Sequence, residues 1–216
     1  MTSEGSGEWF PLPDEDVNRS ASSEIMSERL DSLLPDDPAT GVTTYEAFRI
    51  YLGGFMDLMA RHGQPLSLLA IAADPSETLQ RLGANGALLI ASAIARCLRQ
   101  ETRIYDVVGR GQSDEAHGSY AFLLALPMTS ETLARPFAAR LREAMTISTG
   151  NLGGPWLTLS VGIASLSLET DSPEKLILRS RQALAGAQRS GGDCIWGHAD
   201  TVRRIIKSEW HDSSQE

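Results

Sequence analysis

The stretch from 104 to 126, IYDVVGRGQSDEAHGSYAFLLAL, holds two apolar, β-forming runs separated by polar and glycine residues. Residues 104–110 and 120–126 are predicted to pair as the two strands of a hairpin, because the polar segment between them favours a reversal of the chain. Helical and strand-like segments alternate on both sides of this hairpin. The hairpin is therefore predicted to be the central unit in the order of elements along the chain.

Segments with the apolar spacing of helices are found at 44–61, 78–100, 132–145 and 172–189. Short runs that favour strands are found at 66–73, 156–164 and 194–196. The predicted order is α-β-α-β-β-α-β-α-β, in which a central hairpin is flanked by β-α units. This order predicts a single α/β palm domain with a ferredoxin-like core, whose mainly antiparallel sheet is flanked by helices.

Two of the predicted helices carry local signals at their ends. Ser172, Pro173 and Glu174 provide a cap, a proline at the first helical position and an acid near the positive end of the helix dipole. Pro136 means that the helix at 132–145 either starts after this residue or bends there.

The composition indicates one domain with polar ends. The 216 residues are 42% hydrophobic and carry a net charge of −9, which argues against a general nucleic-acid binder. Residues 1–36 are predicted to be a flexible acidic leader with a short helix at 24–34, and residues 199–216 a C-terminal helix and tail. The N-terminus lacks signal-peptide features, and no run reaches the roughly 18 apolar residues of a membrane span, so we expect a cytoplasmic protein without membrane insertion.

Three motifs, taken together, resemble those of one family. Arg103 and Asp106 stand three residues apart before the first hairpin strand, as in the RxxD pair of GGDEF domains, the domains of diguanylate cyclases. The segment 37–42 (DPATGV) resembles the family's DxLTGL opening, and 158–164 (TLSVGIA) is similar to its TxSxGIA strand. On this resemblance, residues 37–198 are identified as a GGDEF-type domain of a bacterial signalling protein.

The positions of the family's catalytic groups depart from its pattern. Ala72 stands where the resemblance places the first metal-binding carboxylate, and Asp74 stands at the family's second Asp. The family's base- and phosphate-contacting positions are occupied by Gln80, Arg81, Gln188, Gly192 and Asp193. The GGDEF signature aligns with either 112–116 (QSDEA) or 118–122 (GSYAF), and the second alignment keeps the following strand in register. These departures predict a degenerate domain with no catalytic residues, no bound metal and no cofactor.

The RxxD pair matches the site at which the family binds cyclic di-GMP. A guanidinium can fork onto a phosphate or a guanine edge, and a carboxylate accepts hydrogen bonds from guanine N–H groups. Arg103 and Asp106 are therefore predicted to bind cyclic di-GMP, with Arg99 and Arg96 on the preceding helix as candidates for a further arginine. The resemblance implies an inactive receptor that signals through an unidentified protein partner or as a homodimer.

Three alternatives remain open from the sequence. Arg103 and Asp106 can instead form a surface ion pair that binds no ligand. The domain can serve as a protein-interaction scaffold that binds no nucleotide. It can also be a residual cyclase that uses Asp74 and Glu115 with Mg²⁺, since hard cations take carboxylate ligands.

Overall fold

The computed structural model describes residues 35–74, 81, 83–112, 121–150, 157–167 and 172–200. These residues belong to a compact unit that begins at Pro35. The predicted leader helix at 24–34, the hairpin residues 113–120 and the tail from 201 lie outside the described residues. Within the described part of the chain, no helix is both long and apolar enough to cross a bilayer.

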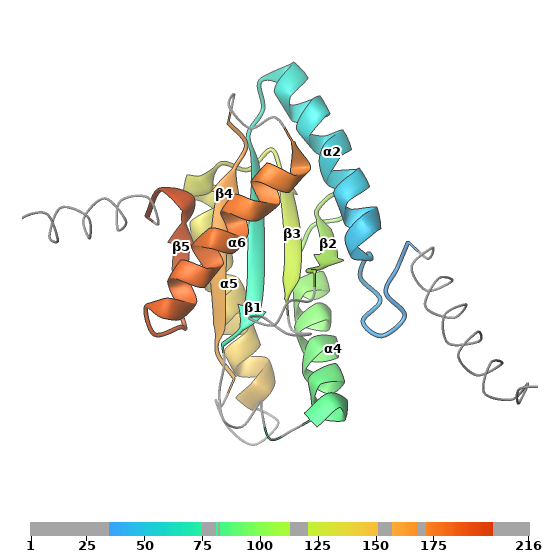
Figure 1. Ribbon diagram of the computed structural model, residues 1–216, viewed down its shortest axis with the longest axis vertical. Helices are drawn as coiled ribbons and strands as arrows, with labels where there is room; N and C mark the ends of the chain where they lie inside the picture. The colour runs from blue at the N-terminus through green and yellow to red at the C-terminus, as the bar shows by residue number, and fades with distance from the viewer. Residues whose placement is uncertain are drawn as a thin grey trace, which may run out of the picture. The chain divides into compact units, whose positions relative to one another are not determined.

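The described elements follow the order that the sequence predicts (Figure 1). The helices are α2 (Tyr45–His62), α4 (Gly83–Glu101), α5 (Glu131–Gly150) and α6 (Pro173–Arg189). The strands are β1 (Leu66–Ala73), β2 (Val107–Arg110), β3 (Phe122–Pro127), β4 (Leu159–Ser165) and β5 (Ile195–Gly197). The predicted start of α6 is confirmed: the Ser172 hydroxyl accepts a hydrogen bond from the Lys175 N–H, and Pro173 follows the cap.

The strands form one sheet in the order β2-β3-β1-β4-β5. Every neighbouring pair is antiparallel except β4 and β5, which are parallel. Ala70 at the middle of β1 lies opposite Leu123 on one side and Gly162 on the other. All residues of β1 are buried, as expected of a central strand covered on both faces. The predicted palm-type sheet is therefore confirmed.

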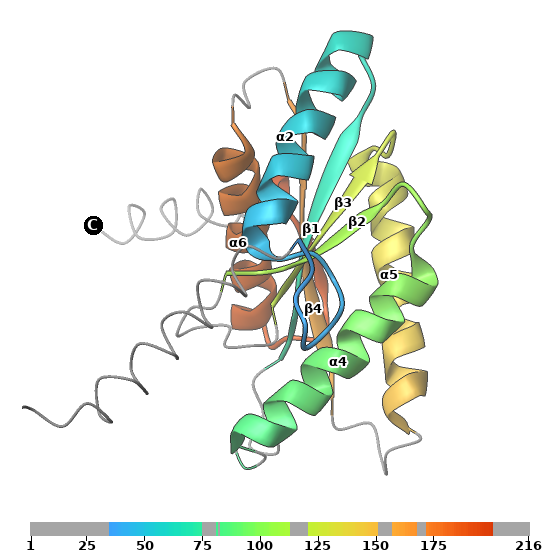
Figure 2. The same cartoon turned by 90° about the vertical axis from the view of Figure 1, so that its right-hand side faces the viewer.

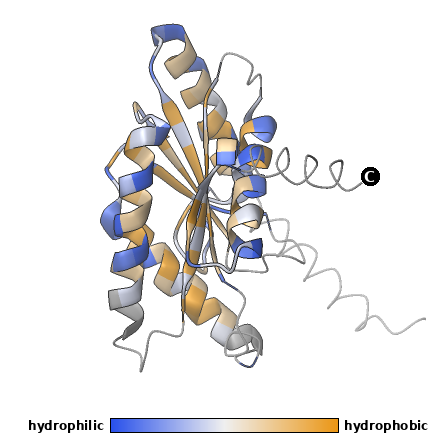
Figure 3. Cartoon of the chain, turned by 90° about the vertical axis from the view of Figure 1, so that its left-hand side faces the viewer, coloured by the Kyte–Doolittle hydropathy of each residue, from blue (hydrophilic) through white to orange (hydrophobic). Residues whose placement is uncertain are grey.

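Helices cover both faces of the sheet, with α2 and α6 on one face and α4 and α5 on the other (Figure 2). Alternate residues of β1 divide between the two cores: Leu68 and Ala70 pack under α2 and α6, whereas Leu69 and Ile71 pack under α4 and α5. The hydropathy colouring shows mainly hydrophobic strands between helices in which hydrophilic and hydrophobic residues alternate (Figure 3).

The contact between α6 and β4 depends on a glycine. A Cβ placed on Gly162 would lie 2.7 Å from the Cα of Leu184 and would also overlap the backbone oxygen of Ser180. Both obstructing groups belong to the backbone of α6, so they cannot move aside as a flexible side chain would. The absence of a side chain at Gly162 therefore sets how closely α6 approaches the sheet.

Two local predictions, the start of the first hairpin strand and the extent of the helix that contains Pro136, are corrected by the structure. Residues 104 and 105 form a turn, and the strand predicted from 104 begins at Val107. Arg110 is partly buried and packs on the hairpin: its Nε lies 3.3 Å from the Asp37 carboxylate, and its guanidinium lies over the ring of Phe122, the residue opposite it. The helix containing Pro136 starts before it, at Glu131, and continues to Gly150, beyond the predicted end.

Candidate functional site

Arg103 and Asp106 lie in the turn that joins α4 to β2. The Asp106 Oδ2 accepts a hydrogen bond of 2.8 Å from the Arg103 backbone N–H, and the Asp106 N–H donates to the Arg103 carbonyl. The Arg103 guanidinium is instead directed to Tyr105, donating to its hydroxyl at 3.1 Å. Among the described residues, no ion pair joins the side chains of Arg103 and Asp106. The alternative in which Arg103 and Asp106 form a surface ion pair through their side chains is therefore not observed among the described residues.

A pocket of about 260 Å³ opens beside this turn. Its walls come from the turn, from the end of β3 and from the first half of α5. The residues that line it are Arg103, Asp106, Leu126, Met128, Thr129, Leu133, Pro136, Phe137 and Arg140. The pocket thus combines an apolar wall with two guanidinium groups and one carboxylate, a mixture suited to a flat apolar ring that carries polar edges and a negative charge.

The Asp106 carboxylate has one unsatisfied oxygen. Its Oδ1 is buried and has no hydrogen-bond partner, which costs on the order of 1–3 kcal/mol. Burial raises the pKa of the Asp106 carboxyl above its ordinary value, while the hydrogen bond from the Arg103 N–H and the charge of Arg103 act in the opposite direction. Asp106 therefore lines the pocket as a residue, while its Oδ1 atom is enclosed by the protein.

Arg140 is a pocket residue that sequence reasoning missed. Its Nε donates to Glu101 at 3.2 Å, and its guanidinium lies over the Phe137 ring. Arg99, one of the two arginines proposed from the sequence, instead donates to the Gly41 carbonyl at 3.2 Å. Neither Arg99 nor Arg96 lines the pocket. The position of Arg140 on the pocket-facing side of α5 follows only from how α5 packs beside the turn.

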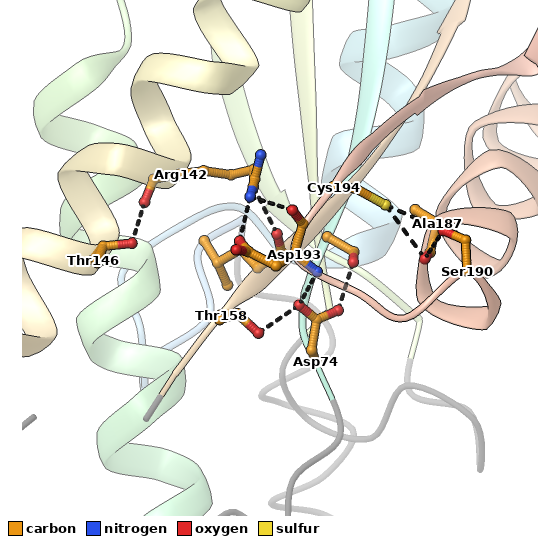
Figure 4. A network of polar contacts seen from close by, with 10 residues as sticks. Asp74, Arg142, Thr146, Thr158, Ala187, Ser190, Asp193 and Cys194 are labelled. Carbon is orange, nitrogen blue, oxygen red and sulfur yellow. Dashed lines mark hydrogen bonds and ion pairs between the residues drawn. The ribbon is translucent and has the colours of Figure 1, made fainter. Parts of the chain in front are cut away.

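The end of β1, where the family's metal site is expected, holds an internal hydrogen-bond network around Asp74 (Figure 4). The Asp74 carboxylate is buried and accepts hydrogen bonds from the Thr158 hydroxyl at 2.7 Å, the Ser160 hydroxyl at 2.5 Å and the Asp193 backbone N–H at 2.8 Å. Ala72, at the position of the first metal-binding carboxylate, is fully buried among apolar side chains. Asp74 therefore ties β1 to β4 and to the turn after α6.

The other residues at catalytic positions also form internal contacts. The Asp193 carboxylate pairs with Arg142 on α5, and Arg142 also donates to the Leu159 carbonyl at 3.1 Å. The Gln188 side-chain amide donates to the Ala73 carbonyl at 3.4 Å. Gly192 packs directly on the Asp74 carboxylate. These contacts give each polar group a structural role at this end of the sheet.

Replacing Asp74 with asparagine is expected to lower the free energy of unfolding by about 1–3 kcal/mol, because the amide NH₂ would face hydrogen-bond donors. Urea unfolding should show a lower midpoint at an unchanged slope. Asp57→Asn, at an exposed position on α2, is the matched control and should be neutral. An unchanged midpoint for Asp74→Asn would show that the network does not stabilise the fold.

The alignment of the GGDEF signature and the role of Glu115 as a metal ligand are not tested by the described residues. Both alignments of the signature include residues of the segment 113–120, and Glu115 lies there too, outside the described residues. The described strands place Arg110 opposite Phe122, and the Gly111 N–H donates to the Ala121 carbonyl at 2.8 Å. Within the described residues, no three His, Cys, Asp or Glu side chains gather as metal ligands would.

Known structures with this fold include several complexes. The GGDEF domain of DgcB from Caulobacter crescentus, in complex with c-di-GMP, aligns with a TM-score of 0.65 at 16% identity, over 76% of this chain and 93% of that one. The diguanylate cyclase SiaD from Pseudomonas aeruginosa, in complex with its activator SiaC, aligns with a TM-score of 0.66 at 26% identity, over 85% and 71%. The FimX GGDEF domain from Pseudomonas aeruginosa aligns with a TM-score of 0.64 at 21% identity, over 76% and 99%.

Sequence comparison with curated proteins finds no matching relative. The family profile described as "Diguanylate cyclase, GGDEF domain" does match, over residues 36–194. This match covers most of the chain and includes the turn, the pocket and the Asp74 network. The chain therefore belongs to the GGDEF-domain family of diguanylate cyclases.

Proposed function

We propose that this protein is a cyclic di-GMP receptor that has lost cyclase activity. The observation that carries the proposal is the pocket in which Arg103, Asp106 and Arg140 meet an apolar wall. In this proposal the Asp106 carboxylate, which lines the pocket, accepts hydrogen bonds from guanine N–H groups. The two guanidinium groups bind phosphate oxygens or the O6 and N7 acceptors of guanine.

The number of contacts is sufficient for a signalling ligand only when all three charged groups take part. Micromolar affinity requires about 8 kcal/mol, and a hydrogen bond to a charged group contributes about 1.5–3 kcal/mol. Arg103 and Asp106 alone fall short of this value. Arg140 and the apolar contacts on Leu133 and Phe137 supply the remainder in this proposal.

The loss of cyclase activity is proposed from the other end of the sheet. Ala72 has no side-chain group that can ligate a metal ion, and the Asp74 carboxylate accepts hydrogen bonds from the Thr158 and Ser160 hydroxyls and the Asp193 N–H. Nucleotidyl transfer in this family needs divalent cations held by carboxylates. A buried Asp74 whose two oxygens already accept three hydrogen bonds is poorly suited to replace the missing ligand, which supports a receptor over a residual enzyme.

The proposal is tested by calorimetric titration of the full chain with cyclic di-GMP, in parallel with GTP plus Mg²⁺ and a chromatographic assay for product. We expect saturable binding of cyclic di-GMP and no conversion of GTP. The stoichiometry reports whether a stacked dimer of the ligand binds. Turnover of GTP that is lost in Glu115→Ala would instead establish a cyclase, and absence of cyclic di-GMP binding would exclude the receptor function.

Binding of cyclic di-GMP is expected to depend on pH through Asp106. Only the carboxylate accepts two N–H groups, so affinity should fall as the pH is lowered through the raised pKa of Asp106, at a higher pH than for an ordinary aspartate. Titrations across the acid range should show this loss in the parent, whereas Asp106→Asn should bind weakly with a flat profile. The same profile in both proteins would assign the titration to another group.

A second function, that of a protein-interaction scaffold, is favoured by the resemblance to SiaD, whose solved structure contains the activator SiaC. Helix α2 also exposes the apolar side chains Ile50, Tyr51 and Leu58. In this case partner binding would be independent of the pocket. A pull-down that is unaffected by cyclic di-GMP and by Arg103→Ala would support the scaffold, and the calorimetric result distinguishes the two functions.

A further inference from the structure

Met128 adopts a backbone conformation that methionine ordinarily avoids. Its φ is 55°, in the left-handed region, where a Cβ crowds the following carbonyl and where glycine, asparagine and aspartate are normally found. The residue joins β3 to α5. Its side chain is 61% exposed, so burial in the core does not compensate for the strained backbone.

The strained turn is held by its neighbours rather than by the methionine side chain. The Thr129 carbonyl accepts a hydrogen bond of 2.8 Å from the buried Ser67 hydroxyl, and the Thr129 hydroxyl donates to the Pro127 carbonyl at 3.1 Å. Thr129 itself is buried. These contacts fix the residues on both sides of Met128, and glycine at position 128 would adopt the same backbone conformation with less strain.

The exposed part of Met128 lies on the wall of the pocket that also holds Asp106 and Arg103. With Leu133 and Phe137, it makes this wall apolar. A thioether is polarizable and makes favourable contacts with aromatic rings. Met128 is thus a strained, exposed apolar residue on the wall of a charged pocket. Folding stability alone does not explain such a residue, whereas contact with a bound ligand does.

We propose that Met128 is a specificity-determining residue of the pocket, whose thioether packs against the face of an aromatic base while Asp106 binds the edge of that base. The inference rests on the proposed function, because it takes a purine dinucleotide as the ligand. The role proposed for Met128 is recognition of the face of the base, whereas the arginines and Asp106 recognise the charge of the ligand and the hydrogen-bonding edge of the base.

The test compares two substitutions in the full chain. Met128→Ala removes the thioether and keeps a Cβ in the left-handed region, whereas Met128→Gly removes both. Both variants should bind cyclic di-GMP about tenfold more weakly than the parent by calorimetry. Only Met128→Gly should melt about 2–4 °C higher than the parent. Leu178→Ala, which removes an exposed apolar side chain from α6, is the control and should bind as the parent does.

The outcomes separate this inference from the proposed function. Parent-like affinity in both variants would overturn the role of Met128 while leaving cyclic di-GMP binding established. An unchanged melting temperature in Met128→Gly would overturn the argument from strain. Absence of cyclic di-GMP binding by the parent itself would refute the proposed function, and the role of Met128 with it.

Discussion

Replacing Gly162 with alanine is expected to destabilise the protein by about 3 kcal/mol, because the new Cβ would overlap the backbone of α6. The helix would have to move away from β4, and this movement would loosen the packing of Leu184 against the sheet. Urea unfolding monitored by circular dichroism measures the change as a lower midpoint. A valine at this position is expected to prevent folding, since it adds further atoms at the same contact.

Gly54→Ala is the matched control for this prediction. Gly54 lies in α2 with nothing within 4 Å of an added Cβ, so alanine there removes only the entropic cost of a helical glycine. This variant should be more stable than the parent by about 0.5–1 kcal/mol. Equal midpoints for Gly162→Ala and the parent would show that α6 does not depend on a glycine for its close approach to β4.

Replacing Arg103 with alanine is expected to weaken cyclic di-GMP binding more than a hundredfold. The loss of two charge-assisted hydrogen bonds corresponds to about 3 kcal/mol or more. The side chain is exposed and contacts Tyr105, so its removal should leave the melting temperature unchanged. Calorimetric titration measures the affinity, and differential scanning calorimetry confirms that the variant remains folded.

Two further variants locate the interaction. Arg103→Lys keeps the charge and loses the fork of donors, so it should recover only part of the affinity. Arg99→Ala removes an arginine that lies outside the pocket lining and donates to the Gly41 carbonyl, so it should bind nearly as the parent does. Arg140→Ala should lose affinity as Arg103→Ala does. Parent-like binding by Arg103→Ala would place the ligand elsewhere or exclude it.

Much of the fold follows from local sequence properties. The uniform apolar run of β1 indicates a strand buried on both faces, and the Ser172-Pro173-Glu174 signal marks the start of α6. Each of these features depends on residues that are adjacent in the chain, so it can be predicted directly from the sequence. The same holds for the proximity of Arg103 and Asp106, which are joined by one short turn. By contrast, residues 104 and 105 have strand-like propensity but form this turn, because the Arg103–Asp106 hydrogen bonds close it.

The composition of the pocket and the roles of its residues were decided by tertiary structure. Arg140 follows Asp106 by more than thirty residues in the chain, and only the packing of α5 beside the turn brings both into one pocket. Likewise, the Asp74 carboxylate accepts hydrogen bonds from the Ser160 hydroxyl on β4 and from the Asp193 N–H in the turn after α6. The sequence by itself determined the order of the elements and the RxxD turn, since both depend on neighbouring residues. The third charged group, the strained Met128 and the buried network depend on long-range packing, which no local pattern encodes.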